Sequence, residues 1–106
     1  MDRETAKAIN SVKTFKKAIS KKIKVDKLIV FGSAAMGRLG KHSDIDMILV
    51  SKSFKGLDSE NRGPPLYFDW PSDRPFDLIC LTPQEAKTKR KYPGIVKEAI
   101  REGLEI

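Results

Sequence analysis

The chain of 106 residues contains a single cysteine and a single histidine. One cysteine cannot form an intrachain disulfide, so a reducing compartment, the cytoplasm, is the expected location. Cys80 lies in the apolar segment LICL and is expected to be a small core residue. With only one histidine and one cysteine, the chain also has too few ligands for a zinc site.

Long hydrophobic runs are missing as well. No apolar segment approaches the roughly 18–20 residues that span a bilayer, and the N-terminal MDRETAKAIN lacks the apolar core of a secretory signal. We therefore expect no membrane association. The length suits one domain covering residues 1–106, and a hydrophobic content of 40% is enough for a modest core.

Acidic residues are the minority, with 14 Asp and Glu against 21 Lys and Arg, and the net charge is +7. This balance favours polyanionic partners such as nucleotides, nucleic acid or an acidic protein. Many lysines fall on the polar faces of the first predicted helix, where a solvated surface is the simpler interpretation. Because no aromatic residues alternate with these lysines and no known nucleic-acid module is present, we do not expect nucleic acid as the partner.

Hydrophobic periodicity predicts a first helix over residues 3–23, with Asp2 as its N-cap. The apolar positions of this helix recur at steps of three and four: Ile9, Val12, Phe15, Ile19 and Ile23. Three apolar segments are typical of buried strands: 28–31, 45–50 and 76–81. The expected fold is therefore α/β or α+β, a small mixed sheet of three or more strands with helices packed on it.

Shorter helices are expected between and after the strands. One would span residues 34–38, and another would lie around 65–70 in a segment rich in Gly and Pro. Thr82-Pro83-Gln84-Glu85 has the spacing of a capping box with proline at the first helical position. A last helix over 93–102 is expected to end at Gly103 and to bury four apolar residues. These residues are Ile95, Val96, Ala99 and Ile100.

Three aspartates lie in apolar segments, where a bare carboxylate is costly to bury. Asp44 and Asp46 are two residues apart and point to the same face of their strand, and Asp77 begins FDLICL in a similar way. If the two strands are neighbours, all three carboxylates share one face and repel one another unless cations hold them. Oxygen ligands of this kind suit two Mg²⁺ ions, with Mn²⁺ as the alternative. We therefore predict a metal site at Asp44, Asp46 and Asp77.

A second motif, Gly32-Ser33, follows the first strand. A strand that turns into a helix here leaves backbone N–H groups free to bind an anion, and phosphate is the usual one. Glycine allows close backbone approach, and the serine hydroxyl adds a donor. Arg38 and Lys41 are candidates for further phosphate contacts, whereas His42 is expected to be an exposed loop residue.

The order FGS, ten residues, DIDMILV and a later strand aspartate resembles the polymerase-beta nucleotidyltransferase superfamily. Within it, the chain is similar to the minimal nucleotidyltransferases, over nearly its whole length. The resemblance implies that Gly32 and Ser33 hold the nucleotide phosphates. It also implies that Asp44 and Asp46 bind both metal ions, and that Asp77 completes the site beside the acceptor hydroxyl.

Members of this group commonly act as antitoxins beside a HEPN-type ribonuclease toxin, and some transfer AMP to a tyrosine of that partner. The resemblance thus implies NMP transfer, with ATP as the substrate and a HEPN-type protein as the acceptor. A chain of this length leaves no room for a separate acceptor-binding body, which also favours a protein partner. Four apolar residues are candidates for docking that partner or for a homodimer contact, or they cover the sheet of the same chain: Leu66, Tyr67, Phe68 and Trp70.

Two alternatives are compatible with the same residues. A non-catalytic antitoxin would act by occupancy alone, and Met36, where the family often has arginine, favours it. Transfer to a small-molecule hydroxyl would keep the chemistry and change only the acceptor. Substitution of Asp44 separates occupancy from transfer, because only transfer requires the carboxylate.

Overall fold

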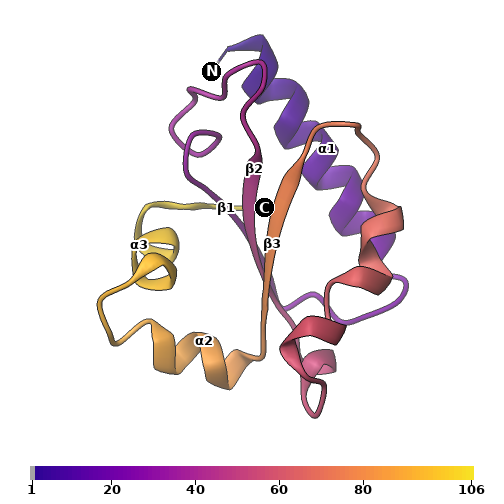
Figure 1. The fold of residues 1–106 in the computed structure, drawn as a ribbon, viewed down its shortest axis with the longest axis vertical. Coiled ribbons are helices and arrows are strands. Elements are labelled where there is room, and N and C mark those ends of the chain that lie inside the picture. The colour runs from indigo at the N-terminus through magenta and orange to yellow at the C-terminus, as the bar shows by residue number, and fades with distance from the viewer. Residues whose placement is uncertain (1) are drawn as a thin grey trace.

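A four-stranded mixed sheet forms the centre of the computed structural model, which describes residues 2–106 (Figure 1). The elements follow the chain as α1 (Arg3–Ile19), β1 (Lys27–Phe31), β2 (Ile45–Val50), η1 (Lys52–Phe54), η2 (Ser59–Asn61), η3 (Pro64–Asp69), β3 (Phe76–Leu81), α2 (Pro83–Lys89), α3 (Ile95–Glu102) and β4 (Leu104–Glu105), where η denotes a 3₁₀ helix. The sheet order is β3-β2-β1-β4. Within residues 2–106, no helix is both long and apolar enough to cross a membrane. The expected class, helices packed on a small mixed sheet, is confirmed.

The central strand β2 pairs antiparallel with β1 and parallel with β3. A parallel pair needs a long crossover, and residues 51–75 with their three short 3₁₀ helices provide it. The predicted limits of β2 and β3 are confirmed, and β1 begins one residue earlier than predicted, at Lys27. The short strand β4, which pairs with β1, was not predicted.

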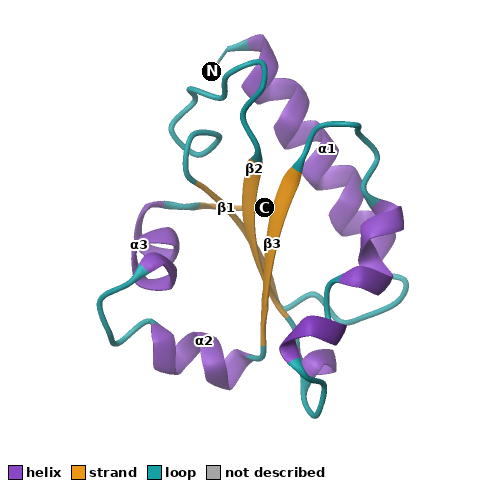
Figure 2. Cartoon of the chain, viewed as in Figure 1, coloured by secondary structure: helices purple, strands orange, loops and turns teal. Residues whose placement is uncertain are grey.

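Each face of the sheet is covered by a different set of helices. Figure 2 shows α1 and the crossover on one side and α2 and α3 on the other. Along β2, the side chains of Ile45, Met47 and Leu49 are fully buried against α1, whereas Ile48 and Val50 pack beneath α3. Asp46 is two residues before Ile48 on the strand, so its side chain points to the same face, the one that carries α2 and α3.

The crossover covers the α1 face with aromatic side chains. Trp70 contacts Phe15 edge to face and lies 5.0 Å from Phe76 between ring centroids. Leu66 is buried in the same core, so these two residues cover the sheet of their own chain. Tyr67 also contacts Phe76 but is 47% exposed, and Phe68 is 94% exposed. The four apolar residues of this segment therefore divide into two core residues and two surface residues.

The first two helix predictions differ from the structure. The first helix ends at Ile19 rather than at residue 23, and the N–H groups of Lys21 and Lys22 then donate to carbonyls three residues back in a turn. Ile23 still packs against the core from this turn. Residues 34–38 form hydrogen-bonded turns instead of a helix, since Gly37 has a φ of 70°, which a right-handed helix does not accommodate.

The last helix differs from its prediction in two details. It begins at Ile95 rather than at residue 93, and Ile95 is 62% exposed, so only three of the four predicted apolar residues are buried or half-buried. Gly103 ends the helix with an ordinary φ of −74°, not in the left-handed region. Glycine is needed there for space, because a Cβ atom would lie 2.5 Å from Cγ2 of Ile29.

A buried arginine joins the crossover to the start of α2. Arg62 is 8% exposed, and its guanidinium donates to the carbonyls of Leu57 and Cys80 and to both carboxylate oxygens of Glu85, the shorter contact being 2.6 Å. Glu85 also accepts from the Thr82 N–H, which confirms the predicted capping box. The hydrogen bond from Arg62 lowers the pKa of Glu85 to about 2.

This ion pair predicts a defined acid sensitivity. The pKa of Glu85 rises to 4.5 in the unfolded chain, so its stabilising effect is complete above pH 4.5 and is lost as the pH falls toward 2. In urea unfolding between pH 6 and 2, we expect E85Q to be less stable than the wild type near neutrality, with the difference shrinking in acid. A stability difference that stays constant over this range would contradict the assignment. Glu60→Gln, at an exposed glutamate, is the matched control and should leave the stability nearly unchanged over the same pH range.

Candidate active site

One row of side chains crosses three strands on the α3 face of the sheet. Phe31 of β1 is the register partner of Asp46 of β2, which in turn is the register partner of Asp77 of β3. Register partners point to the same face, so the two carboxylates stand side by side. Asp44 lies two residues before Asp46, just outside the strand, and is exposed. The predicted adjacency of the two acidic strands is therefore confirmed.

The electrostatics of this row centre on Asp46, which is half-buried. Burial raises the pKa of Asp46, and the charges of Asp77 and then Asp44, together with a side-chain hydrogen bond to Asp77, raise it further. Without a cation, the like charges of the two carboxylates repel each other.

In the described part of the chain, no basic side chain forms an ion pair with these acids. Among residues 2–106, the ion pairs of the structure all lie elsewhere, and none involves Asp44, Asp46 or Asp77. Hard carboxylate oxygens that lie side by side, at Asp46 and Asp77, fit a divalent cation such as Mg²⁺. As the described side chains lie, however, no three His, Cys, Asp or Glu converge closely enough to enclose a metal ion. Asp46 and Asp77 form the pair, and Asp44 acts on it electrostatically.

Gly32 brings the backbone against the acidic row. It follows β1 with a φ of 71°, and a Cβ atom at this position would lie 2.7 Å from Oδ2 of Asp46. Only glycine leaves room for the carboxylate here and adopts this backbone without strain. Ser33 is exposed in the same turn, where its carbonyl accepts from the N–H groups of Met36 and Arg38. The predicted phosphate turn and the predicted metal ligands are thus direct neighbours.

The basic candidates in the following loop point in different directions. Arg38 is exposed next to the Gly32 turn, and no ion pair of it is found in the described part of the chain. Lys41 and the exposed His42 instead line a groove of about 450 Å³ with Lys7 and Asp73, between α1 and the segment before β3. Lys41 therefore lines a different pocket from Gly32, and its phosphate contact stays a prediction.

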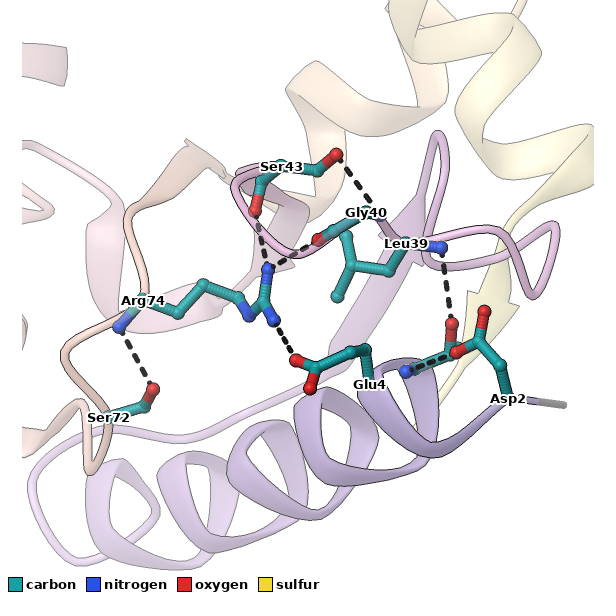
Figure 3. A network of polar contacts seen from close by, with 8 residues as sticks. Asp2, Glu4, Leu39, Gly40, Ser43, Ser72 and Arg74 are labelled. Atoms are coloured by element: carbon teal, nitrogen blue, oxygen red, sulfur yellow. Dashed lines mark hydrogen bonds and ion pairs between the residues drawn. The ribbon is translucent and has the colours of Figure 1, made fainter.

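An arginine that the sequence did not single out holds this loop in place (Figure 3). Arg74 donates to the carbonyls of Gly40 and Ser43 at 2.9 Å each and pairs with Glu4 at 2.6 Å. Nearby, the Leu39 N–H donates to the hydroxyl of Thr5, which is fully buried. These contacts tie the segment before Asp44 to the start of α1. Nothing in the sequence around SDRPF distinguishes this arginine from a surface residue.

A small cavity opens on the other side of the Gly32 turn. Its volume is about 200 Å³, and its walls come from the end of β1, the turn and α3. Phe31, Ala35, Met36 and Ile95 supply apolar surface, while Glu98 and Glu102 of α3 are the acidic lining residues. Met36 and Ile95 are 59% and 62% exposed, so the cavity is open to solvent. It lies directly beside the phosphate turn because Gly32 belongs to both.

The family follows from comparison with known proteins. A family model described as a nucleotidyltransferase domain matches residues 12–104. The chain belongs to this nucleotidyltransferase family. Membership supports the transfer of a nucleoside monophosphate from a nucleoside triphosphate, in a family that typically uses a divalent metal ion. No curated protein matches the sequence significantly.

A solved structure agrees with the fold of this nucleotidyltransferase. The crystal structure of a candidate nucleotidyltransferase from Sulfolobus solfataricus superposes with a TM-score of 0.67 at 19% sequence identity. The match covers 95% of this chain and 80% of that one. At this level of identity, the likeness concerns the arrangement of the backbone alone.

The contact between Gly32 and Asp46 can be tested by substitution. We expect Gly32→Ala to destabilise the fold by more than Gly37→Ala, because both positions have φ near 70° but no atom lies within 4 Å of a Cβ at Gly37. The control therefore reports the cost of the left-handed backbone alone, about 1–2 kcal/mol. Urea unfolding measures both variants. In a D46A background the two costs should become equal, and an excess cost at Gly32 that persists there would contradict the contact.

Proposed function

We propose that this nucleotidyltransferase transfers AMP from ATP to a hydroxyl group of a partner protein, and that the partner is a HEPN-type toxin which the chain counteracts. The observation that carries the transfer chemistry is the row formed by Asp46 and Asp77 beside the Gly32 turn. Two repelling carboxylates next to a backbone shaped for close approach have no structural purpose of their own. They fit a site that holds a cation and a triphosphate together.

In this proposal, Asp46 and Asp77 hold the divalent cation, and the exposed Asp44 turns toward them to complete the ligand set when the cation binds. When bound, the cation neutralises the triphosphate and lowers the pKa of the attacking hydroxyl. The backbone N–H groups of the Gly32-Ser33 turn bind and orient the phosphates, and the exposed Arg38 supplies a counter-charge. The Arg74 contacts hold the segment before Asp44 beside the start of β3.

The transfer itself balances with one bond formed and one broken. The acceptor oxygen forms a bond to the α-phosphorus, the bond from that phosphorus to the bridging oxygen breaks, and pyrophosphate leaves with the electron pair. Asp77, at the edge strand, accepts the proton of the hydroxyl in this scheme. Asp46, half-buried in the middle of the row, keeps its position as a ligand in this scheme.

A protein acceptor is supported by the surface of the crossover. Phe68 is 94% exposed on η3, and the neighbouring Tyr67 is 47% exposed although it contacts Phe76. Exposed aromatic residues are frequent anchors of protein interfaces. The choice of a HEPN-type toxin rests on the family resemblance described above.

The decisive variant is Asp46→Asn. With Mg²⁺, α-labelled ATP and a HEPN-type ribonuclease as acceptor, we expect the wild type to label the acceptor. Labelling by D46N should fall by more than about 10–100-fold, which is the loss typical of substituting a residue that only hydrogen-bonds to a metal ligand. D46N should also be more stable than the wild type without divalent cations, because the pKa of Asp46 is raised in the fold and its ionisation at neutral pH opposes folding.

Asp58→Asn is the matched control, since Asp58 is exposed and its side chain makes no capping hydrogen bond. D58N should label the acceptor as the wild type does. Equal labelling by D46N and the wild type would contradict the proposed site. If D46N suppressed the ribonuclease as well as the wild type without labelling it, the non-catalytic mode of action would replace transfer.

A further inference from the structure

The cavity between the Gly32 turn and α3 has the features of a nucleobase site. We propose that it binds the base of the nucleoside triphosphate and that Glu98 and Glu102 select a base carrying an exocyclic amino group. The inference rests on the proposed transfer function, because it places the phosphates at the turn. It adds a base-recognition surface to which none of the three aspartates contributes.

The volume argues for one part of a nucleotide. About 200 Å³ is below the roughly 300–1,000 Å³ of pockets that enclose whole drug-sized ligands, so the cavity cannot take base, ribose and triphosphate together. Its walls are mostly apolar, which suits a flat ring and not a phosphate chain. Met36 contributes a flexible thioether, a group that contacts aromatic rings favourably. The residue found where the family often has arginine thus has a use in this site.

The charges of the cavity orient the ligand. Glu98 and Glu102 are one helical turn apart on α3 and share a single nitrogen of Arg101, at 2.9 and 3.0 Å. Two carboxylates paired with one guanidinium leave a net negative charge at the α3 end of the cavity. A triphosphate is repelled by that charge and remains at the Gly32 end, whereas the base extends toward α3.

The glutamates then act on the edge of the base. Ionised carboxylates only accept hydrogen bonds, so they favour a ring that presents N–H groups. The 6-amino group of adenine supplies two such donors, and purine riboside, which has hydrogen in its place, supplies none at that position. Both side chains are more than half exposed, so their pairing with Arg101 is weak and can yield to a base.

The test compares ATP with purine riboside triphosphate, which differ only in the amino group. Calorimetric titration with Mg²⁺ and without acceptor should show ATP binding about tenfold tighter to the wild type, the effect of one hydrogen bond to a charged group. In E98Q/E102Q the ratio of the affinities for ATP and purine riboside triphosphate should fall to about twofold or less. Neutral amides accept hydrogen bonds more weakly than carboxylates, and they can also donate to the unprotonated ring nitrogens of the base. Met36→Ala should weaken both ligands equally and leave the ratio unchanged.

E105Q, at an exposed glutamate outside the cavity, is the control and should keep the wild-type ratio. Equal affinity of the wild type for the two triphosphates would overturn the inference, and so would an unchanged ratio in the double variant. In both cases the nucleotides still bind and the proposed transfer function stands. If neither triphosphate bound to the wild type, the proposed function itself would fail together with the inference.

Discussion

The repulsion between the carboxylates of Asp46 and Asp77 is the constraint on which the rest of this structure depends. The two residues are register partners on parallel strands, and both point to the α3 face. Burial and like charge raise the pKa of Asp46, so the fold holds this pair against a free-energy cost. A sheet built for stability alone would place apolar side chains here, as it does two residues further along at Ile48 and Ile79. In the proposed function, a cation shared by both carboxylates offsets this cost.

The elements around the pair serve to keep it in place. The crossover 51–75 makes β3 parallel to β2, and only this pairing brings Asp77 level with Asp46. Arg62 fastens the crossover to the start of α2 through Glu85, and Arg74 fastens the other loop to α1 through Glu4. The positions of Asp46 and Asp77 are thus supported by two ion pairs, one on each side of the sheet. Both arginines are largely buried, so their contacts are more rigid than those of surface pairs.

Much of this architecture could be predicted from the sequence, because its signals are local. Alternation along IDMILV and FDLICL predicts the strands and the face of each aspartate, and Thr82 with Glu85 three residues later predicts the start of α2. The failures concern backbone details that hydrophobic alternation does not reveal. The turn after Gly32 has helix-forming residues, yet the left-handed backbone at Gly37 prevents a helix.

At the candidate site, too, only local signals can be read from the sequence. The three aspartates and the Gly32 turn could be predicted, because each places an acidic residue or a glycine in or beside an apolar segment. The role of Arg74 could not, because its partners Gly40, Ser43 and Glu4 are more than 30 residues away in the sequence. The cavity beside α3 is equally hidden, since its walls come from residues 31–36 and 95–102.

Paramagnetic relaxation by Mn²⁺ tests the central claim most directly. In ¹⁵N-resolved spectra of the protein with an ATP analogue that cannot be cleaved, trace Mn²⁺ should broaden the amide signals of Gly32, Asp46 and Asp77 before any others. The same addition to D46N should leave these signals sharp. Broadening centred on Glu98 and Glu102, or on the acidic segment 58–60, would contradict a cation site at the paired carboxylates.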